Sequence, residues 1–226
     1  MKHQQTQQAL LYGFVARADF SAHPVDELLD YFPELPGRIV YGIEVPNTAM
    51  VPEIMSEGLI PSWTQKVLGG PANFMDLSAL LDIKYYGRLE GEEGGKSRSE
   101  RVVRRHNWAL QMERIPVSKS PKMLVHLYNE TVQIMATAEE KWQVVNSFPC
   151  GNEEELLYHC GNIAEQLGWD RKEASLELSG RSAREYRPVL APYFGQVELF
   201  AYQNWVKVST ALDEFDPLEN AALLRL

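Results

Sequence analysis

The feature that most constrains this chain is a change of hydrophobic period in its second half. Three short apolar runs come first, at 123–128, 131–137 and 142–148, and turns of two to four residues separate them. Such runs with tight turns are typical of an antiparallel meander. Over residues 156–167 the apolar side chains recur instead at helical spacing. The pattern therefore predicts three strands followed by a helix.

The predicted helix has clear signals at both ends. Asn152 is a good N-cap residue, and three glutamates follow it in the first turn, where the helix dipole favours negative charge. Gly168 suits the left-handed conformation that ends many helices. We expect Leu157 and Ile163 on the buried face of this helix.

Beyond this helix the chain alternates between the two kinds of element. Residues 174–180 predict a strand that ends in Ser-Gly, and residues 182–194 predict a helix that Pro188 bends or shifts. Residues 196–200 predict a last strand. The second half therefore has the predicted order β-β-β-α-β-α-β, which places the chain in the α/β class.

The first half has weaker patterns. Residues 37–46 predict a strand, and residues 51–58 predict a helical turn or two. In residues 107–117 apolar and polar side chains alternate, which predicts another strand.

Two segments suggest how the chain is divided. Residues 87–106 combine glycines with many charges and few apolar residues, so they predict a charged, solvated loop, although the part from Ser99 to Trp108 could begin a strand or a helix. Residues 115–123 contain two prolines and two serines, which predicts a hinge. We therefore expect an N-terminal part of residues 1–118 and a C-terminal part of residues 119–226.

Composition excludes several classes of protein. Hydrophobic residues make up 45% of the chain and charged residues 23%, as in ordinary globular proteins, so the chain is not disordered throughout. The net charge of −9 argues against nucleic acid or an anionic membrane as the main partner. No apolar run reaches the ~18 residues that a membrane span needs, and the N-terminus lacks the regions of a signal peptide. We therefore expect a cytoplasmic protein with its two cysteines reduced.

Candidate catalytic or metal-binding residues are few. Apart from the adjacent His159 and Cys160, which point to different sides of a helix, no histidine has a close ligand spacing, so we predict no metal site. Cys150 precedes the predicted helix, whose N-terminus lowers thiol pKa values, but no base partner is evident. The alternative for Cys150 is a small buried apolar residue.

Three stretches resemble an uncharacterised bacterial family whose members have an actin-like ATPase fold and no established activity. They are residues 37–58, 122–180 and 197–226, and the second contains the meander, the long helix and a Leu-x-Leu-Ser-Gly strand end. The resemblance implies an α/β actin-like ATPase fold of two ribonuclease H-like subdomains, each a mixed sheet with helices. The first subdomain, within residues 1–118, would be abbreviated.

The resemblance also implies where a nucleotide would bind. Relatives with this fold hold Mg-ATP with two phosphate loops and an adenosine loop, and residues 124–131 and 176–182 match the second phosphate loop and the adenosine loop. The metal-orienting Asp falls near His126, and the phosphate-loop glycines fall on residues 128–130, so both are missing. The remaining candidates for the nucleotide cleft are Ser179, Gly180, Arg181, Asn129 and Thr131. An ordinary hairpin turn and simple turn chemistry are the alternatives for these two segments.

The degenerate phosphate loops favour a non-catalytic binding or scaffold protein that has no catalytic residue and no cofactor. The alternative is an ATP-binding protein, an ATPase or a phosphotransferase of the actin-like class, which would bind ATP with magnesium between the two subdomains. A second alternative is docking of an acidic or nucleic-acid partner through the basic loop 96–106. The sequence identifies no protein partner and does not decide whether the chain forms a homodimer.

Overall fold

A computed structural model describes part of the chain. The described residues are 39–43, 47–52, 60–68, 74–78, 83–88, 102–128, 130–201, 216–219 and 221. The chain divides into two compact units, one of residues 1–40 and 95–103 and the other of residues 41–94 and 104–226. The elements that concern function belong to the second unit.

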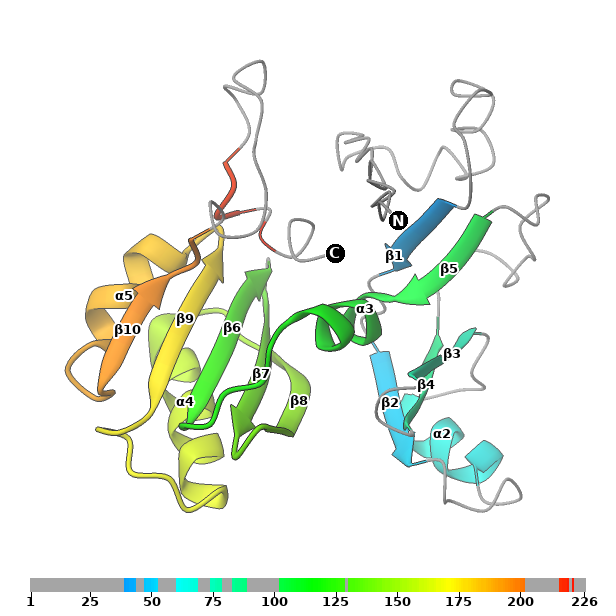
Figure 1. Ribbon diagram of the computed structural model, residues 1–226, viewed down its shortest axis with the longest axis horizontal. Helices are drawn as coiled ribbons and strands as arrows, with labels where there is room; N and C mark the ends of the chain where they lie inside the picture. The colour runs from blue at the N-terminus through cyan, green and yellow to red at the C-terminus, as the bar shows by residue number, and fades with distance from the viewer. Residues whose placement is uncertain are drawn as a thin grey trace, which may run out of the picture. The chain divides into compact units, whose positions relative to one another are not determined.

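A five-stranded mixed sheet forms the C-terminal part of the second unit (Figure 1). The order of its strands is β10-β9-β6-β7-β8, in which β6, β7 and β8 pair antiparallel and β9 lies parallel to both β6 and β10. The predicted meander is confirmed. The strands are β6 (Lys122–Tyr128), β7 (Thr131–Ala138), β8 (Lys141–Pro149), β9 (Ser175–Gly180) and β10 (Gln196–Leu199).

Two helices connect these strands, α4 (Glu153–Gln166) and α5 (Ala183–Leu190), which contains Pro188 as predicted. The side-chain oxygen of Asn152 accepts a hydrogen bond from the N–H of Glu155 at 2.9 Å, so the predicted N-cap of α4 is confirmed. Gly168 follows the C-cap with φ of 69°, and its N–H donates to the carbonyl of Glu165 at 3.0 Å. The predicted helix signals are thus both used.

The sheet buries both of its faces. Met123, Val125 and Leu127 of β6 belong to the larger core, which also contains buried residues of α4 and α5. Leu124 points the opposite way and packs with residues of α3 in a second, smaller core. In Figure 1, α4 and α5 lie together behind the sheet.

The buried face of α4 agrees with the prediction at Ile163 but not at Leu157. Ile163 is buried, as expected, and so is Leu156, which is fully covered. Leu157 is only partly buried and packs at the margin of the core. The expectation that Leu157 belongs to the buried face is therefore corrected in favour of Leu156.

The strand predicted for residues 107–117 is wrong, because these residues begin with the helix α3 (Asn107–Arg114). Trp108, Met112 and Ile115 are buried together against the sheet, and their spacing forms one helical stripe. The segment is also rich in good helix formers, and Pro116 follows its end.

The described elements of the first half are short. Strands β1 and β5 pair with each other, and β2, β4 and β3 form an antiparallel sheet in that order. A strand within residues 37–46 is confirmed. The elements are β1 (Ile39–Ile43), β2 (Asn47–Pro52), α2 (Ile60–Leu68), β3 (Phe74–Ser78), β4 (Ile83–Arg88) and β5 (Val102–His106).

Two expectations for the first half need correction. The helical turns predicted from residue 51 are wrong at their start, because β2 continues through Pro52, which pairs with Ile83 of β4. Cross-strand pairing overrides the local pattern there. The predicted loop 87–106 is also shorter than expected, because β4 includes residues 87 and 88. β5 at residues 102–106 agrees with the alternative that a strand begins after residue 99. Residues 53–59 and 89–101 lie outside the described residues.

Candidate functional site

The two segments predicted to face a nucleotide meet at one edge of the five-stranded sheet. Strands β6 and β9 are parallel, and Leu127 of β6 is the register partner of Gly180. Their carboxyl ends therefore lie together, which is where open α/β sheets usually bind ligands. Thr131 begins β7 at the same edge, opposite Tyr128. Asn129 lies outside the described residues.

A buried polar pair joins β6 and β9 just before this edge. The Nδ1 atom of His126 lies 3.0 Å from the Oγ atom of Ser179, and the two side chains are 6% and 0% exposed. The Ser179 hydroxyl also donates to the carbonyl of Val125 at 3.4 Å. The imidazole of His126 is thus bonded to the neighbouring strand.

Gly180 is required by the backbone of the neighbouring strand. Its φ is 98°, and a Cβ atom at this position would lie 1.9 Å from the carbonyl oxygen of Leu127. Only glycine fits so close an approach in the left-handed region. The Gly180 N–H donates to the carbonyl of Leu218 at 2.8 Å, so this backbone donor is already bonded within the chain.

The β6–β7 hairpin uses its own polar groups. The Thr131 hydroxyl donates to the carbonyl of Tyr128 at 2.8 Å, which closes the turn. The carbonyl of Glu130 accepts a hydrogen bond from the N–H of Cys150 at 2.8 Å. The structure thus brings Thr131, Ser179 and Gly180 to one edge and gives each of them a partner in the protein.

Four charged side chains surround the turn between β9 and α5. Arg184 forms an ion pair with Asp216, with nitrogen–oxygen distances of 2.7 and 3.5 Å. Arg181 is largely exposed and lies 3.9 Å from Glu219. A hydrogen bond from Arg184 holds the pKa of Asp216 below its usual range, and the N–H of Leu218 acts in the same direction. Sequence reasoning identified Arg181 but missed Arg184 and Asp216.

The chain matches known proteins in two of three comparisons. Residues 108–197 match the family described as "Protein of unknown function (DUF3822)". The structure is similar to that of a protein from Bacteroides thetaiotaomicron, described as having an actin-like ATPase fold and unknown function. The TM-score is 0.63, the identity is 14%, and the alignment covers 90% of this chain and 82% of that one. No curated protein matches in sequence.

These comparisons confirm the resemblance that the sequence suggested. The chain is a mixed α/β protein whose fold is similar to that of a protein with an actin-like ATPase fold. At 14% identity the likeness concerns the fold alone. The site must therefore be interpreted from this chain's own residues.

The two cysteines lie in the same core, and neither is activated. Burial raises the pKa of the Cys150 thiol, and the carboxylate of Glu155 raises it further. Burial also raises the pKa of Cys160. The lowered thiol pKa considered for Cys150 is therefore wrong, because burial and the charge of Glu155 outweigh the hydrogen bond between the thiol and the Asn152 backbone, which lowers the pKa. Its role as a small buried residue is confirmed.

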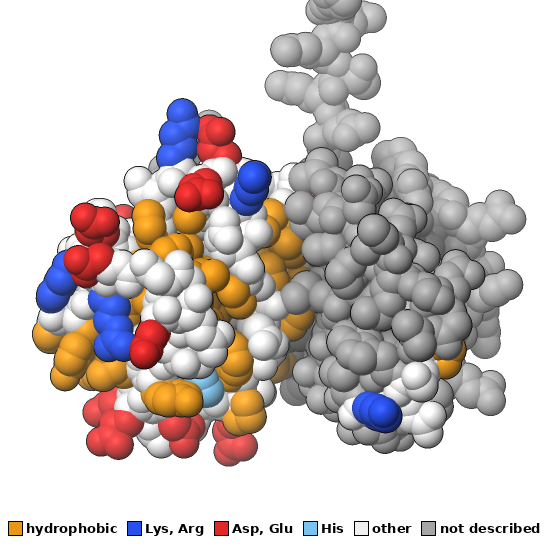
Figure 2. All heavy atoms as spheres, turned by 90° about the horizontal axis from the view of Figure 1, so that it is seen from below, with side chains coloured by type: hydrophobic (Ala, Val, Ile, Leu, Met, Phe, Trp, Pro, Cys, Tyr) orange, Lys and Arg blue, Asp and Glu red, His pale blue; other side chains and the backbone are white. Residues whose placement is uncertain are grey.

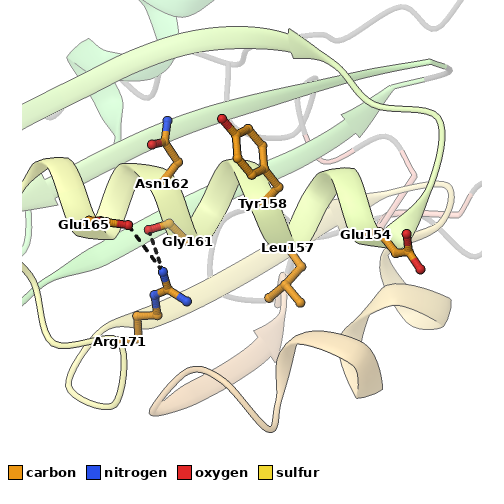
Figure 3. Close-up of a pocket in the computed structure, with 7 residues that line it drawn as sticks. All are labelled: Glu154, Leu157, Tyr158, Gly161, Asn162, Glu165 and Arg171. Atoms are coloured by element: carbon orange, nitrogen blue, oxygen red, sulfur yellow. Dashed lines mark hydrogen bonds and ion pairs between the residues drawn. The ribbon is translucent and has the colours of Figure 1, made fainter.

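A surface cavity of about 320 Å³ lies along the outer side of α4 (Figure 3). The guanidinium of Arg171 covers Gly161 and contacts its carbonyl at 3.5 Å, with Glu165 at 3.9 Å. Tyr158 is 66% exposed beside it. The cavity contains none of the residues predicted for a nucleotide. It is lined by Glu154, Leu157, Tyr158, Gly161, Asn162, Glu165 and Arg171.

The described surface carries charges of both signs. Figure 2 shows Asp and Glu side chains next to Lys and Arg side chains on one face, with hydrophobic groups between them. Among the helices that the structure describes, none has the length and apolar character needed to cross a bilayer.

Proposed function

We propose that this chain is a non-catalytic binding or scaffold protein in which the nucleotide site of the fold has been closed. The observation that carries the proposal is the buried hydrogen bond between His126 and Ser179 at 3.0 Å. It lies beside the strand ends that would face the phosphates and the adenosine. Its two side chains, an imidazole and a hydroxyl, cannot replace the carboxylate that would orient a metal-bound water, and they are already bonded to each other.

The hairpin between β6 and β7 supports the same proposal. Phosphate loops need glycines because backbone N–H groups must approach the phosphates closely. The chain has Tyr128 and Glu130 at this turn, and the Thr131 hydroxyl closes it through a bond of 2.8 Å. This arrangement stabilises a hairpin and lacks the glycines of a phosphate loop.

The finer architecture is part of the proposal. We assign residues 119–226 to a ribonuclease H-like subdomain and residues 1–118 to an abbreviated one. The strand order β8-β7-β6-β9-β10, with β7 antiparallel to its neighbours, supports the first assignment. The composition supports a cytoplasmic location, and the partner that a scaffold would bind is a protein of unknown identity.

Calorimetry with Mg-ATP on the full chain tests this proposal against the ATP-binding alternative. We expect no saturable heat at micromolar nucleotide, because the donors at Ser179, Gly180 and Thr131 already have partners. Circular dichroism of the same sample establishes that the protein is folded. Micromolar binding accompanied by release of inorganic phosphate would establish the alternative and end the proposal.

A further inference from the structure

The turn of residues 216–219 lies against the carboxyl end of β9, because Leu218 is hydrogen-bonded to Gly180. This strand end is the segment that the resemblance matches to an adenosine loop. We propose that this turn, called the C-terminal plug below, is an intramolecular contact that closes an anion-binding position. It covers the strand end and places the Asp216 carboxylate on a cation that an external oxyanion would otherwise bind. This inference deepens the proposed function and rests on it for the identity of the site.

The backbone of the plug is anchored to the turn. The carbonyl of Leu218 accepts the hydrogen bond from the Gly180 N–H at 2.8 Å, so the plug occupies the donor that a ligand would use. Leu218 is 5% exposed and Ala221 is fully buried, and both belong to the larger core. The plug, which lies 36 to 39 residues beyond Gly180 in the chain, therefore reaches the core through Leu218.

The charges of the plug complement those of the turn. Asp216 faces Arg184 at 2.7 Å, and Glu219 lies 3.9 Å from Arg181. The Asp216 carboxylate also accepts the N–H of Leu218 at 2.8 Å. A guanidinium together with a backbone N–H is a set of donors that also binds phosphate oxygens. The carboxylate thus has the position and the chemistry of an anionic ligand.

The consequence is competition between the plug and an external anion. A phosphate that approached Arg184 would have to displace Asp216, which is tethered to the protein and therefore present at a high effective concentration. Free phosphate at ordinary concentrations is too dilute to displace the Asp216 carboxylate from Arg184. Removal of the Asp216 carboxylate should leave Arg184 available and open the position.

The test compares the wild-type chain with Asp216→Ala, using inorganic phosphate as the probe and sodium chloride of equal ionic strength as the reference. The measurement is the melting temperature as a function of phosphate concentration. We expect a flat response for the wild type. For Asp216→Ala we expect a saturable rise, with half-saturation at least about tenfold below the highest phosphate concentration at which the wild type stays flat, which is a difference of about 1.4 kcal/mol or more.

Two further variants keep the test decisive. The double variant Asp216→Ala with Arg184→Ala should lose the phosphate response, because it lacks the cation. If Asp216→Ala does not fold, Asp216→Asn retains an oxygen that can accept the Leu218 N–H and removes only the charge. A folded Asp216 variant without a phosphate response, or an equal response in the wild type, overturns the plug. Binding of Mg-ATP to the wild type would instead overturn the proposed function, so the two failures are distinguishable.

Discussion

Replacement of Gly180 by alanine separates a structural role of this glycine from a role in ligand binding. A Cβ at residue 180 would lie 1.9 Å from the carbonyl oxygen of Leu127, which belongs to the backbone of β6. Such an atom cannot move without breaking the β6–β9 ladder. If Gly180 existed only to admit a ligand, the substitution would change binding and leave stability nearly intact.

Gly168 provides a matched control within the same part of the fold. Its φ is also positive, at 69°, but a Cβ there would meet no atom within 4 Å. Gly168→Ala therefore carries only the conformational term, which is about 1 kcal/mol of unfolding free energy. Gly180→Ala carries that term and the steric clash, and we expect a loss above about 4 kcal/mol, a size that marks a disrupted core or backbone.

Urea unfolding followed by far-UV circular dichroism measures both losses. In a chain of this size, 1 kcal/mol corresponds to roughly 2–4 °C in melting temperature, so Gly180→Ala should melt at least about 8 °C below the wild type. Gly168→Ala should remain within a few degrees of it. Equal losses for the two variants, or a smaller loss for Gly180→Ala, would refute the argument from the Leu127 carbonyl.

Three other predictions concern the core and the site. Leu156→Ala should lower the unfolding free energy by about 2–5 kcal/mol and Leu157→Ala by about 1 kcal/mol, because only Leu156 is fully buried. The reverse order in urea unfolding would show that the buried face of α4 is misplaced. Ser179→Ala should lose about 1 kcal/mol at an unchanged m-value, because His126 loses the partner of its Nδ1 atom; a neutral result would mean that this bond contributes nothing. The pKa of Asp216 is lowered in the folded chain, so its contribution exists above the unfolded pKa near 3.8 and disappears as pH falls through the lower folded pKa. Melting temperatures recorded from neutral pH downward should therefore fall less in Asp216→Asn than in the wild type over this acidic range, and parallel curves would contradict the prediction.

The second half of the chain could be predicted because its signals are local. The meander has tight turns between apolar runs, and Asn152 and Gly168 mark the two ends of α4 with residues whose conformational preferences are strong. The segment at 107–117 was ambiguous, because Trp108 and Met112 fit an alternating strand as well as one face of a helix. Packing against Leu124 of the sheet selects the helix. That contact has no signature in the segment itself.

The site was only half predictable for the same reason. Ser179 and Gly180 stand out as a strand end before a helix, and the structure places them at the expected edge. Their partners are distant in sequence: His126 is 53 residues before Ser179, and Asp216 is 32 residues after Arg184. An Asp-Pro pair at 216–217 indicates a turn, but the local sequence does not indicate that Asp216 pairs with Arg184.

The closure of this edge depends on tertiary contacts as much as on missing residues. Loss of the metal-orienting Asp would by itself remove catalysis and could leave a nucleotide-binding groove. Here the Gly180 N–H is bonded to Leu218, the Ser179 hydroxyl contacts His126, and Arg184 is neutralised by Asp216. Each contact satisfies a group that would otherwise attract an anion. Together the contacts involve β6 and the turn that begins 36 residues beyond Gly180. These contacts therefore support the proposed binding or scaffold role over an altered ATPase.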